Sequence, residues 1–325
     1  MSTPAGDPAG VSVPRDHRLA EAGVLLVTLV WAANFIVVKA ANQEIPPVAF
    51  ALARFGLAAA VLIVALRLRE GSVAPPKGDA LAIVGLGAIG FGLYQVIWSI
   101  ALQSIPAGDS ALIIAATPVL TALLAVVAGS DVLTRMKLAG GITSFAGVAI
   151  VVLAGPGIGL GLGGSAGTAV LVGDLLTLGA ALCWSVYTAF GAAHLRRHSP
   201  LRTTAWAMVG GCLVLAGPGL WQAAGADWSH VSMGAVAGYF YAAIFAAGLA
   251  NVLVFRAIAL LGPTRITAYQ FLVPFLAVVL GAAFLGEPIR TAQVLGGLVI
   301  VAGVALTRTP RGLDLVSWIA ERLPS

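Results

Sequence analysis

The sequence predicts an all-α integral membrane protein whose ten transmembrane helices form two inverted five-helix repeats. Three observations predict this fold: an apolar composition, ten long apolar segments, and a repeat between the two halves of the chain. Residues of the set AVILMFWYC make up 59% of the 325 residues and charged residues only 10%, whereas soluble proteins carry about 25% charged residues. A soluble enzyme, a nucleic-acid-binding protein and a disordered chain are therefore excluded, because a water-soluble globule of this size needs a charged surface.

Ten segments are long and apolar enough to cross a bilayer, whose hydrocarbon core of about 30 Å needs roughly 20 residues of helix. The first is too long for a signal peptide, and short joints rich in Pro, Gly or charge separate the later ones. The third and eighth segments exceed the required length, so we expect them to be tilted or broken. The predicted helices are 19–40, 47–66, 79–102, 110–128, 138–154, 171–194, 203–221, 232–260, 263–285 and 291–307.

The basic residues outside these segments lie almost entirely on one side of the membrane. With the N-terminus placed inside the cell, the inner segments hold fourteen of the eighteen Lys and Arg residues. The outer segments hold only Lys39 and Arg290, and Arg54 and Arg256 lie within helices. Because positive charge accumulates in the cytoplasmic loops of membrane proteins, the sequence predicts a multi-pass protein of the inner cell membrane with both termini in the cytoplasm.

The two halves of the chain repeat each other with an offset of 156 residues. Five helices fall in each half, and an odd number per half places the halves in the membrane with opposite orientations, as in many secondary transporters. The offset pairs Pro118 with Pro274, Gly140 with Gly296, and Gly147 with Gly303.

This repeat divides the chain into five parts. The first tail is rich in Pro and Gly and has no apolar core, and the last tail places apolar residues at helical spacing between charged ones, which is typical of an interfacial helix. The predicted parts are a disordered cytosolic tail at 1–18, the first five-helix repeat at 19–154, an outer Gly-rich linker at 155–170, the second five-helix repeat at 171–307, and a cytosolic interfacial tail at 308–325.

Several motifs resemble those of one family of membrane proteins. They are Trp31-Ala-Ala-Asn34-Phe35 followed by Lys39, Phe50-Ala-Leu-Ala-Arg54-Phe55, and Leu285-Gly286-Glu287-Pro288 before Gly296-Gly297. With the ten segments and the repeat, the chain resembles the drug/metabolite transporter superfamily, in the type built from two tandem EamA domains. It departs from the family pattern at Ser130-Asp131, where Gly-Glu is usual, and at Tyr187, where the first half has Asn34.

The resemblance implies a secondary transporter with a central cavity between the halves. Members of the family move amino acids, other small metabolites or drug-like compounds, often outward. By this resemblance we expect an exporter that works by alternating access. Helices one, three, four, six, eight and nine would line the cavity, and five and ten would pack outside it. The alternatives are a structural or chaperone-like membrane subunit and, less favoured, a membrane-embedded enzyme, which would need a nucleophile–base pair or clustered acids.

Polar and aromatic residues inside the helices are the candidates for a solute site, because polar groups in lipid are costly and face a bundle interior or a wet cavity. The offset places the amide of Gln95 at the same depth as that of Asn251. Such amides either bind solute or join helices by hydrogen bonds, and the aromatic residues either line a cavity or pack. The candidate cavity residues are Trp31, Asn34, Gln95, Trp98, Ser99, Trp184, Tyr187, Asn251, Tyr269 and Gln270, and the candidate helix breaks are Pro118 and Pro274.

The sequence is less specific about the roles of the charged groups near the helix ends. Arg54 can extend to the outer surface, pair with Asp109 or Asp174, or bind solute. Asp109 and Asp174 begin helices at the outer side, where a carboxylate complements the helix dipole. No Asp, Glu or His falls in the middle of a predicted helix. Proton relays normally use such groups. We therefore expect a facilitator or exchanger rather than a proton antiporter.

The sequence predicts no cofactor and no metal site. Cys183 and Cys212 lie inside apolar segments and are expected to be packed thiols. His194 and His198 lie in a basic inner loop, where a role in topology is favoured over metal binding. The expected partners are a small-molecule solute and the lipid bilayer, without nucleic acid, and the oligomeric state is left open.

Overall fold

The computed structural model describes residues 15–129, 132–154, 165–195, 197–250, 253–254 and 269–307. These residues form helices and no β-strand. Seven helices are long and apolar enough to cross a membrane. They are Glu21–Ala41, Pro47–Glu70, Ala80–Ala101, Ala107–Val127, Arg135–Leu153, Gly167–Gly191 and Pro200–Ala224, and three shorter apolar helices are Met233–Leu249, Leu272–Leu285 and Thr291–Thr307.

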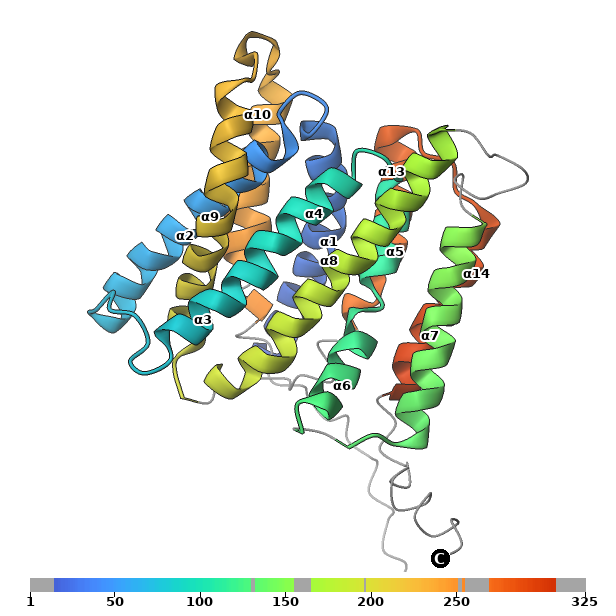
Figure 1. The fold of residues 1–325 in the computed structure, drawn as a ribbon, viewed down its shortest axis with the longest axis horizontal. Coiled ribbons are helices and arrows are strands. Elements are labelled where there is room, and N and C mark those ends of the chain that lie inside the picture. Colours follow the sequence, from blue (N-terminus) through green and yellow to red (C-terminus); the bar gives the residue numbers. More distant parts are fainter. Residues whose placement is uncertain are drawn as a thin grey trace, which may run out of the picture.

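The long helices lie side by side and form a bundle (Figure 1). Helices α2 and α9 pack together near one edge of the bundle, and α7 and α14 pack together at the other. Side chains such as Leu25, Leu29 and Val64 are about half exposed on the outside, as expected for a surface covered by lipid. The bounds of these helices are α1 (Arg15–Ala41), α2 (Pro47–Glu70), α7 (Arg135–Leu153), α8 (Ser165–Leu195), α9 (Pro200–Ala224) and α14 (Thr291–Thr307).

Helix α1 begins within the predicted first tail, and α8 begins within the predicted linker, so both helices are longer than the sequence indicated. The rest of these two parts, the second tail, Ser130-Asp131, Asn251 and Arg256 lie outside the described residues.

The two long predicted segments contain stretches of π-helix. In the third, α3 (Ala80–Gly87) continues through the π-helical η1 (Ala88–Leu93) into α4 (Tyr94–Ala101). In the eighth, α10 (Met233–Phe240) continues into the π-helical η3 (Tyr241–Leu249). An offset of 156 carries η1 onto the last six of the nine residues of η3, so the two halves of the chain deviate from α-helix at equivalent places. Such π-helical turns often occur at functional sites.

The fourth predicted segment is divided into two helices. Helix α5 (Ala107–Ile114) ends before Ala115, and α6 (Thr117–Val127) begins with Pro118 as its second residue. Pro lacks a backbone N–H and is well tolerated in a first helical turn. The same arrangement recurs 156 residues later, where a turn at Phe271 precedes α13 (Leu272–Leu285) and Pro274 is the third residue of that helix.

Helices α7 and α14 pack in antiparallel directions through glycines. A Cβ atom on Gly140 would lie 2.5 Å from the carbonyl oxygen of Gly303, and one on Gly147 would lie 2.7 Å from the carbonyl oxygen of Gly296. Only glycine permits backbones to approach this closely. Gly140 and Gly296 are equivalent under the offset, and so are Gly147 and Gly303. Exchanging the two halves of the chain therefore turns one contact into the other, and the helix pair is symmetric.

Ion pairs connect distant helices at both ends of the bundle. At the end where α1 terminates, Lys39 Nζ lies 2.6 Å from Glu287 Oε1, and Arg290 pairs with Asp109. At the opposite end, the Arg202 guanidinium lies 3.0 Å from Glu70 Oε2.

Also at that opposite end, His198 Nε2 lies 2.8 Å from Asp79 Oδ2. The hydrogen bond with His198, followed by the nearby charges of Arg197 and His194, lowers the pKa of Asp79 below its usual value despite partial burial. The Asp79 carboxylate is therefore held ionised at neutral pH.

Candidate functional site

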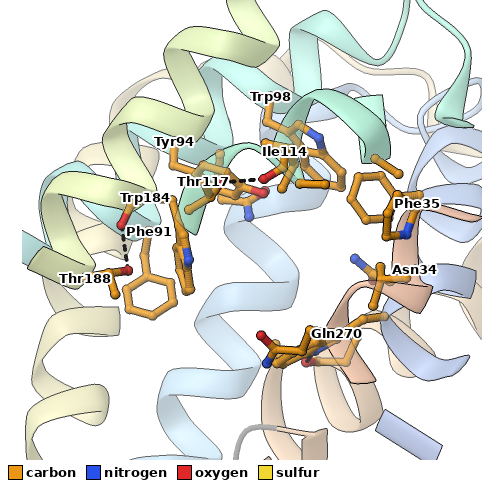
Figure 2. A pocket seen from close by; sticks show the side chains of 18 of the residues that line it. Asn34, Phe35, Phe91, Tyr94, Trp98, Ile114, Thr117, Trp184, Thr188 and Gln270 are labelled. Atoms are coloured by element: carbon orange, nitrogen blue, oxygen red, sulfur yellow. Dashed lines mark hydrogen bonds between the residues drawn. The ribbon is translucent and has the colours of Figure 1, made fainter. Parts of the chain in front are cut away.

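The bundle contains an open cavity of about 470 Å³ between its helices. Its walls come from both halves of the chain: from α1, α2, η1, α4, α5 and α6 in the first, and from α8, α9, η3 and the start of α13 in the second. Figure 2 shows the side chains that surround it. Six of the candidate residues predicted from the sequence line this cavity, namely Trp31, Asn34, Gln95, Trp98, Trp184 and Gln270.

Helices α2 and α9 were not expected at the cavity, yet they contribute Arg54, Phe55 and Met208 to its wall. Helices α7 and α14 contribute no lining residue among those described. The wall therefore includes eight of the predicted segments rather than six.

Aromatic rings form much of the wall. The rings of Tyr94 and Trp98 are stacked with centroids 6.0 Å apart, and Trp184 lies 5.8 Å from Tyr94 and 5.6 Å from Phe91. Phe35 of α1 meets Trp98 edge to face at 5.4 Å. Figure 2 shows Trp98 and Phe35 together on one side of the cavity, opposite Phe91. These mutual contacts fix the rings, so the wall offers a rigid apolar surface to a solute.

Two indole N–H groups of the wall, those of Trp98 and Trp31, donate to the protein itself. Trp98 Nε1 donates to Ser110 Oγ at 2.9 Å, and Trp31 Nε1 donates to the carbonyl oxygen of Ala246 in η3 at 3.1 Å. The hydroxyl of Tyr241 donates in turn to the carbonyl of Val30 in α1 at 2.9 Å. The two tryptophans therefore present ring surface to the cavity rather than hydrogen-bond donors.

Amide side chains supply the neutral polar groups of the wall. Figure 2 shows the side chain of Asn34 directed into the cavity, with Gln270 on the adjacent wall. The Oδ1 atom of Asn34 is buried and has no hydrogen-bond partner among the described residues. Because a buried carbonyl oxygen without a partner is costly, the described protein alone does not satisfy the amide of Asn34.

Arg54 is a cavity residue that was not among the candidate cavity residues predicted from the sequence. It lines the cavity, its side chain is only 2% exposed, and its Nη2 atom donates to Gln95 Oε1 at 2.6 Å. The expectation that it reaches the outer surface or pairs with Asp109 or Asp174 is wrong, because Asp109 binds Arg290 and Gln293 instead. The available signal was a charge inside a membrane segment, which favours a functional role by default.

Three predicted residues do not line the cavity. Ser99 is fully buried, and its backbone carbonyl accepts a hydrogen bond from Asn42 at 3.4 Å. The ring of Tyr187 packs against Phe91 at 5.0 Å, behind the wall. Tyr269 packs against a separate cluster that includes Val24. These three side chains pack outside the cavity lining. The remaining candidate, Asn251, lies outside the described residues.

No group of three His, Cys, Asp or Glu side chains that could hold a metal ion occurs in the part of the chain that the structure describes. Cys183 and Cys212 are free thiols, each partly buried.

Comparison with known proteins places these observations in a family. The profile of the EamA-like transporter family matches the chain twice, over residues 18–153 and 171–309. The uncharacterized transporter YyaM of Bacillus subtilis is 27% identical over 84% of this chain and 88% of its own length. A protein named as a probable terminal-alkyne amino-acid exporter, from Streptantibioticus cattleyicolor, is 28% identical over 87% of this chain and 91% of its own length. A solved crystal structure, 18% identical, matches 95% of this chain and 99% of its own with a TM-score of 0.61.

Proposed function

Since the chain belongs to the EamA-like transporter family, we propose that it is a secondary transporter that exports small organic solutes through the central cavity. Amino acids, other small metabolites and drug-like compounds are the solute classes proposed. The observation that carries the proposal is a cavity of about 470 Å³ lined from both halves of the chain, within the usual range of roughly 300–1,000 Å³ for small-molecule sites. The name of the relative from Streptantibioticus cattleyicolor supports export.

Alternating access around this cavity requires two halves that exchange their roles. The symmetric contact between α7 and α14, the π-helical stretches at equivalent places, and the matched breaks before Pro118 and Pro274 support two inverted five-helix repeats. In this arrangement the seven long helices and the three shorter ones would make ten spans.

The proposed orientation has both termini in the cytoplasm of a cell whose inner membrane holds the protein. The distribution of Lys and Arg, with fourteen residues in inner segments and two in outer segments, supports it. A structural or chaperone-like subunit is the alternative, but it would not need a lined cavity. A membrane-embedded enzyme is less favoured, since the family consists of transporters.

The test is solute movement into liposomes that contain the purified protein. A screen of thermal stability against a metabolite library selects the solutes, and labelled solute is then followed in exchange across the membrane. Ala115→Phe, which places a ring in the cavity wall, should slow exchange at least about tenfold, because it occupies solute space. Ala60→Phe on the exposed side of α2 is the matched control and should leave exchange unchanged. Equal exchange by both variants, or none by the unmodified protein, would contradict the proposal.

A further inference from the structure

We propose that Arg54 and Gln95 form an anion-binding corner of the cavity and that the transported solute carries a carboxylate on an aromatic or apolar body. This inference rests on the proposed function, because it assigns a solute class to the cavity through which transport is proposed to occur.

The charge of Arg54 has no counter-charge in the described structure. Arg54 is the only charged residue among the described residues that line the cavity, and no carboxylate of the described chain lies within 4 Å of its guanidinium. Two other cations of the described residues with largely buried side chains are paired, Lys39 with Glu287 and Arg290 with Asp109. A buried charge is costly unless it is paired, so an unpaired one at a cavity wall is suited to a partner that comes from outside.

The guanidinium is held in place while keeping donors available. Gln95 accepts a single hydrogen bond from Nη2, and the Arg54 Nε atom is buried with no partner among the described residues. The rings of Phe55 and Trp98 lie 4.9 and 5.7 Å from the guanidinium carbon, close enough for cation–π attraction, which orients the group without neutralising it. A planar guanidinium presents pairs of N–H groups that match the two oxygens of a carboxylate.

The rest of the cavity suits an apolar or aromatic body rather than a second charge. Trp98, Tyr94 and Trp184 supply ring surface, and their fixed geometry favours stacking with another ring. The described wall contains no Asp or Glu that could pair with an ammonium group of a solute. An aromatic monocarboxylate therefore fits this wall better than a cation or a neutral solute of the same shape.

The experiment compares three labelled probes that share one ring and differ in charge: phenylacetate, phenylacetamide and 2-phenylethylammonium. Their affinities for the purified full-length protein are measured by equilibrium dialysis. The unmodified protein should bind phenylacetate at least about tenfold more tightly than either of the others, since a charge-assisted pair forms only with the anion. Arg54→Gln should remove this preference, and Arg54→Lys should retain part of it.

Arg67→Gln is the matched control, because Arg67 lies on the same helix but at its exposed end, bonded to the carbonyl of Gly71. It should leave the preference unchanged. If the unmodified protein prefers the amide or the ammonium, binds none of the probes, or keeps its preference in Arg54→Gln, the anion-binding corner is refuted. The comparison among probes on the unmodified protein decides the matter even if Arg54→Gln does not fold.

Transport is measured separately so that the two proposals fail in different ways. Phenylacetate that binds with the expected preference but does not cross proteoliposome membranes would leave the anion-binding corner standing and refute the transport function of the cavity. Transport of solutes without any preference for the anion would leave the transport function standing and refute the anion-binding corner.

Discussion

The indole of Trp31 shows how one side chain connects the first helix to the second half of the chain. Its N–H donates to the carbonyl of Ala246 in η3, and Tyr241 returns a hydrogen bond to the carbonyl of Val30. The two bonds run in opposite directions between the same two elements. They therefore fix how α1 lies against the π-helical stretch on this side of the cavity.

Replacing Trp31 with Phe should lower the free energy of unfolding by about 1 kcal/mol, because the Ala246 carbonyl loses a partner in a partly buried place. Solute affinity should change less than stability, since a ring remains at the wall. Trp228→Phe is the control: Trp228 also donates to a backbone carbonyl, that of Ala223, but is half exposed, so water replaces the bond. Thermal melting of the two purified variants measures their stability. An equal loss of stability in Trp31→Phe and Trp228→Phe would show that the hydrogen bond to η3 does not contribute more than an exposed one.

At this scale the sequence could indicate which side chains face the interior but not how far along each helix the cavity extends. Gln95 and Ser99 share a helical face, yet only Gln95 reaches the cavity, because the adjacent turn of the helix is covered by neighbouring residues. The direction of Arg54 depends on Gln95 and on rings from other helices. Such contacts between distant segments have no counterpart in the periodicity of one segment.

Among the helices, α7 and α14 approach each other closely along their backbones through Gly140, Gly147, Gly296 and Gly303. Neither helix has a lining residue in the described part of the cavity. Their contact therefore serves to hold the halves together, a role that small residues at a membrane helix interface perform.

Gly147→Ala should destabilise the protein by about 1–3 kcal/mol, since the added Cβ would lie 2.7 Å from the Gly296 carbonyl oxygen. Gly141→Ala in the same helix is the control, because its Cβ would make an ordinary contact at 3.6 Å with Val119. The intrinsic preference of helices for Ala over Gly should make this control neutral or stabilising by up to about 1 kcal/mol. Melting temperatures that fall equally in both variants would refute the proposed role of the contact.

The order and type of the helices could be predicted from the sequence, but some of their internal features could not. Pro118 and Pro274 carried a visible signal for the breaks that precede them, because Pro lacks a donor. The π-helical stretches η1 and η3 have no comparable signal, since a shift in hydrogen-bond register leaves the apolar composition unchanged. The 156-residue offset relates the two stretches in the structure, although neither sequence indicates a π-helix.

For the molecule as a whole, composition was the most informative property. An apolar chain with few charges must be a membrane protein, and the structure has seven helices of spanning length among the described residues. Ion pairs at both ends of the bundle connect helices that are far apart in sequence, as Lys39 and Glu287 show. Which charges would pair could not be predicted, because pairing depends on how the helices are arranged around the cavity.

The unpaired charge of Arg54 also has an electrical consequence. Counted over the described lining residues, an empty cavity carries one positive charge, and a cavity that holds a monoanion is neutral. During export the loaded protein would therefore cross its conformational cycle without moving charge. The return of the empty protein would carry the positive charge inward, and a voltage that is negative inside would accelerate that step.

Net efflux of phenylacetate from proteoliposomes should respond to such a voltage, while one-for-one exchange should not, because exchange never uses the empty form. A potassium gradient with a potassium ionophore sets the voltage, and labelled solute reports the flux. At 100 mV the driving force on one charge is about 2.3 kcal/mol, equivalent to about a fiftyfold concentration ratio at equilibrium. Efflux that is indifferent to voltage would mean that a second charge travels with the solute. With Arg54 as the one charge among the described residues that line the cavity, the protein would use the resting voltage of the cell to drive organic acids outward without a proton-carrying side chain.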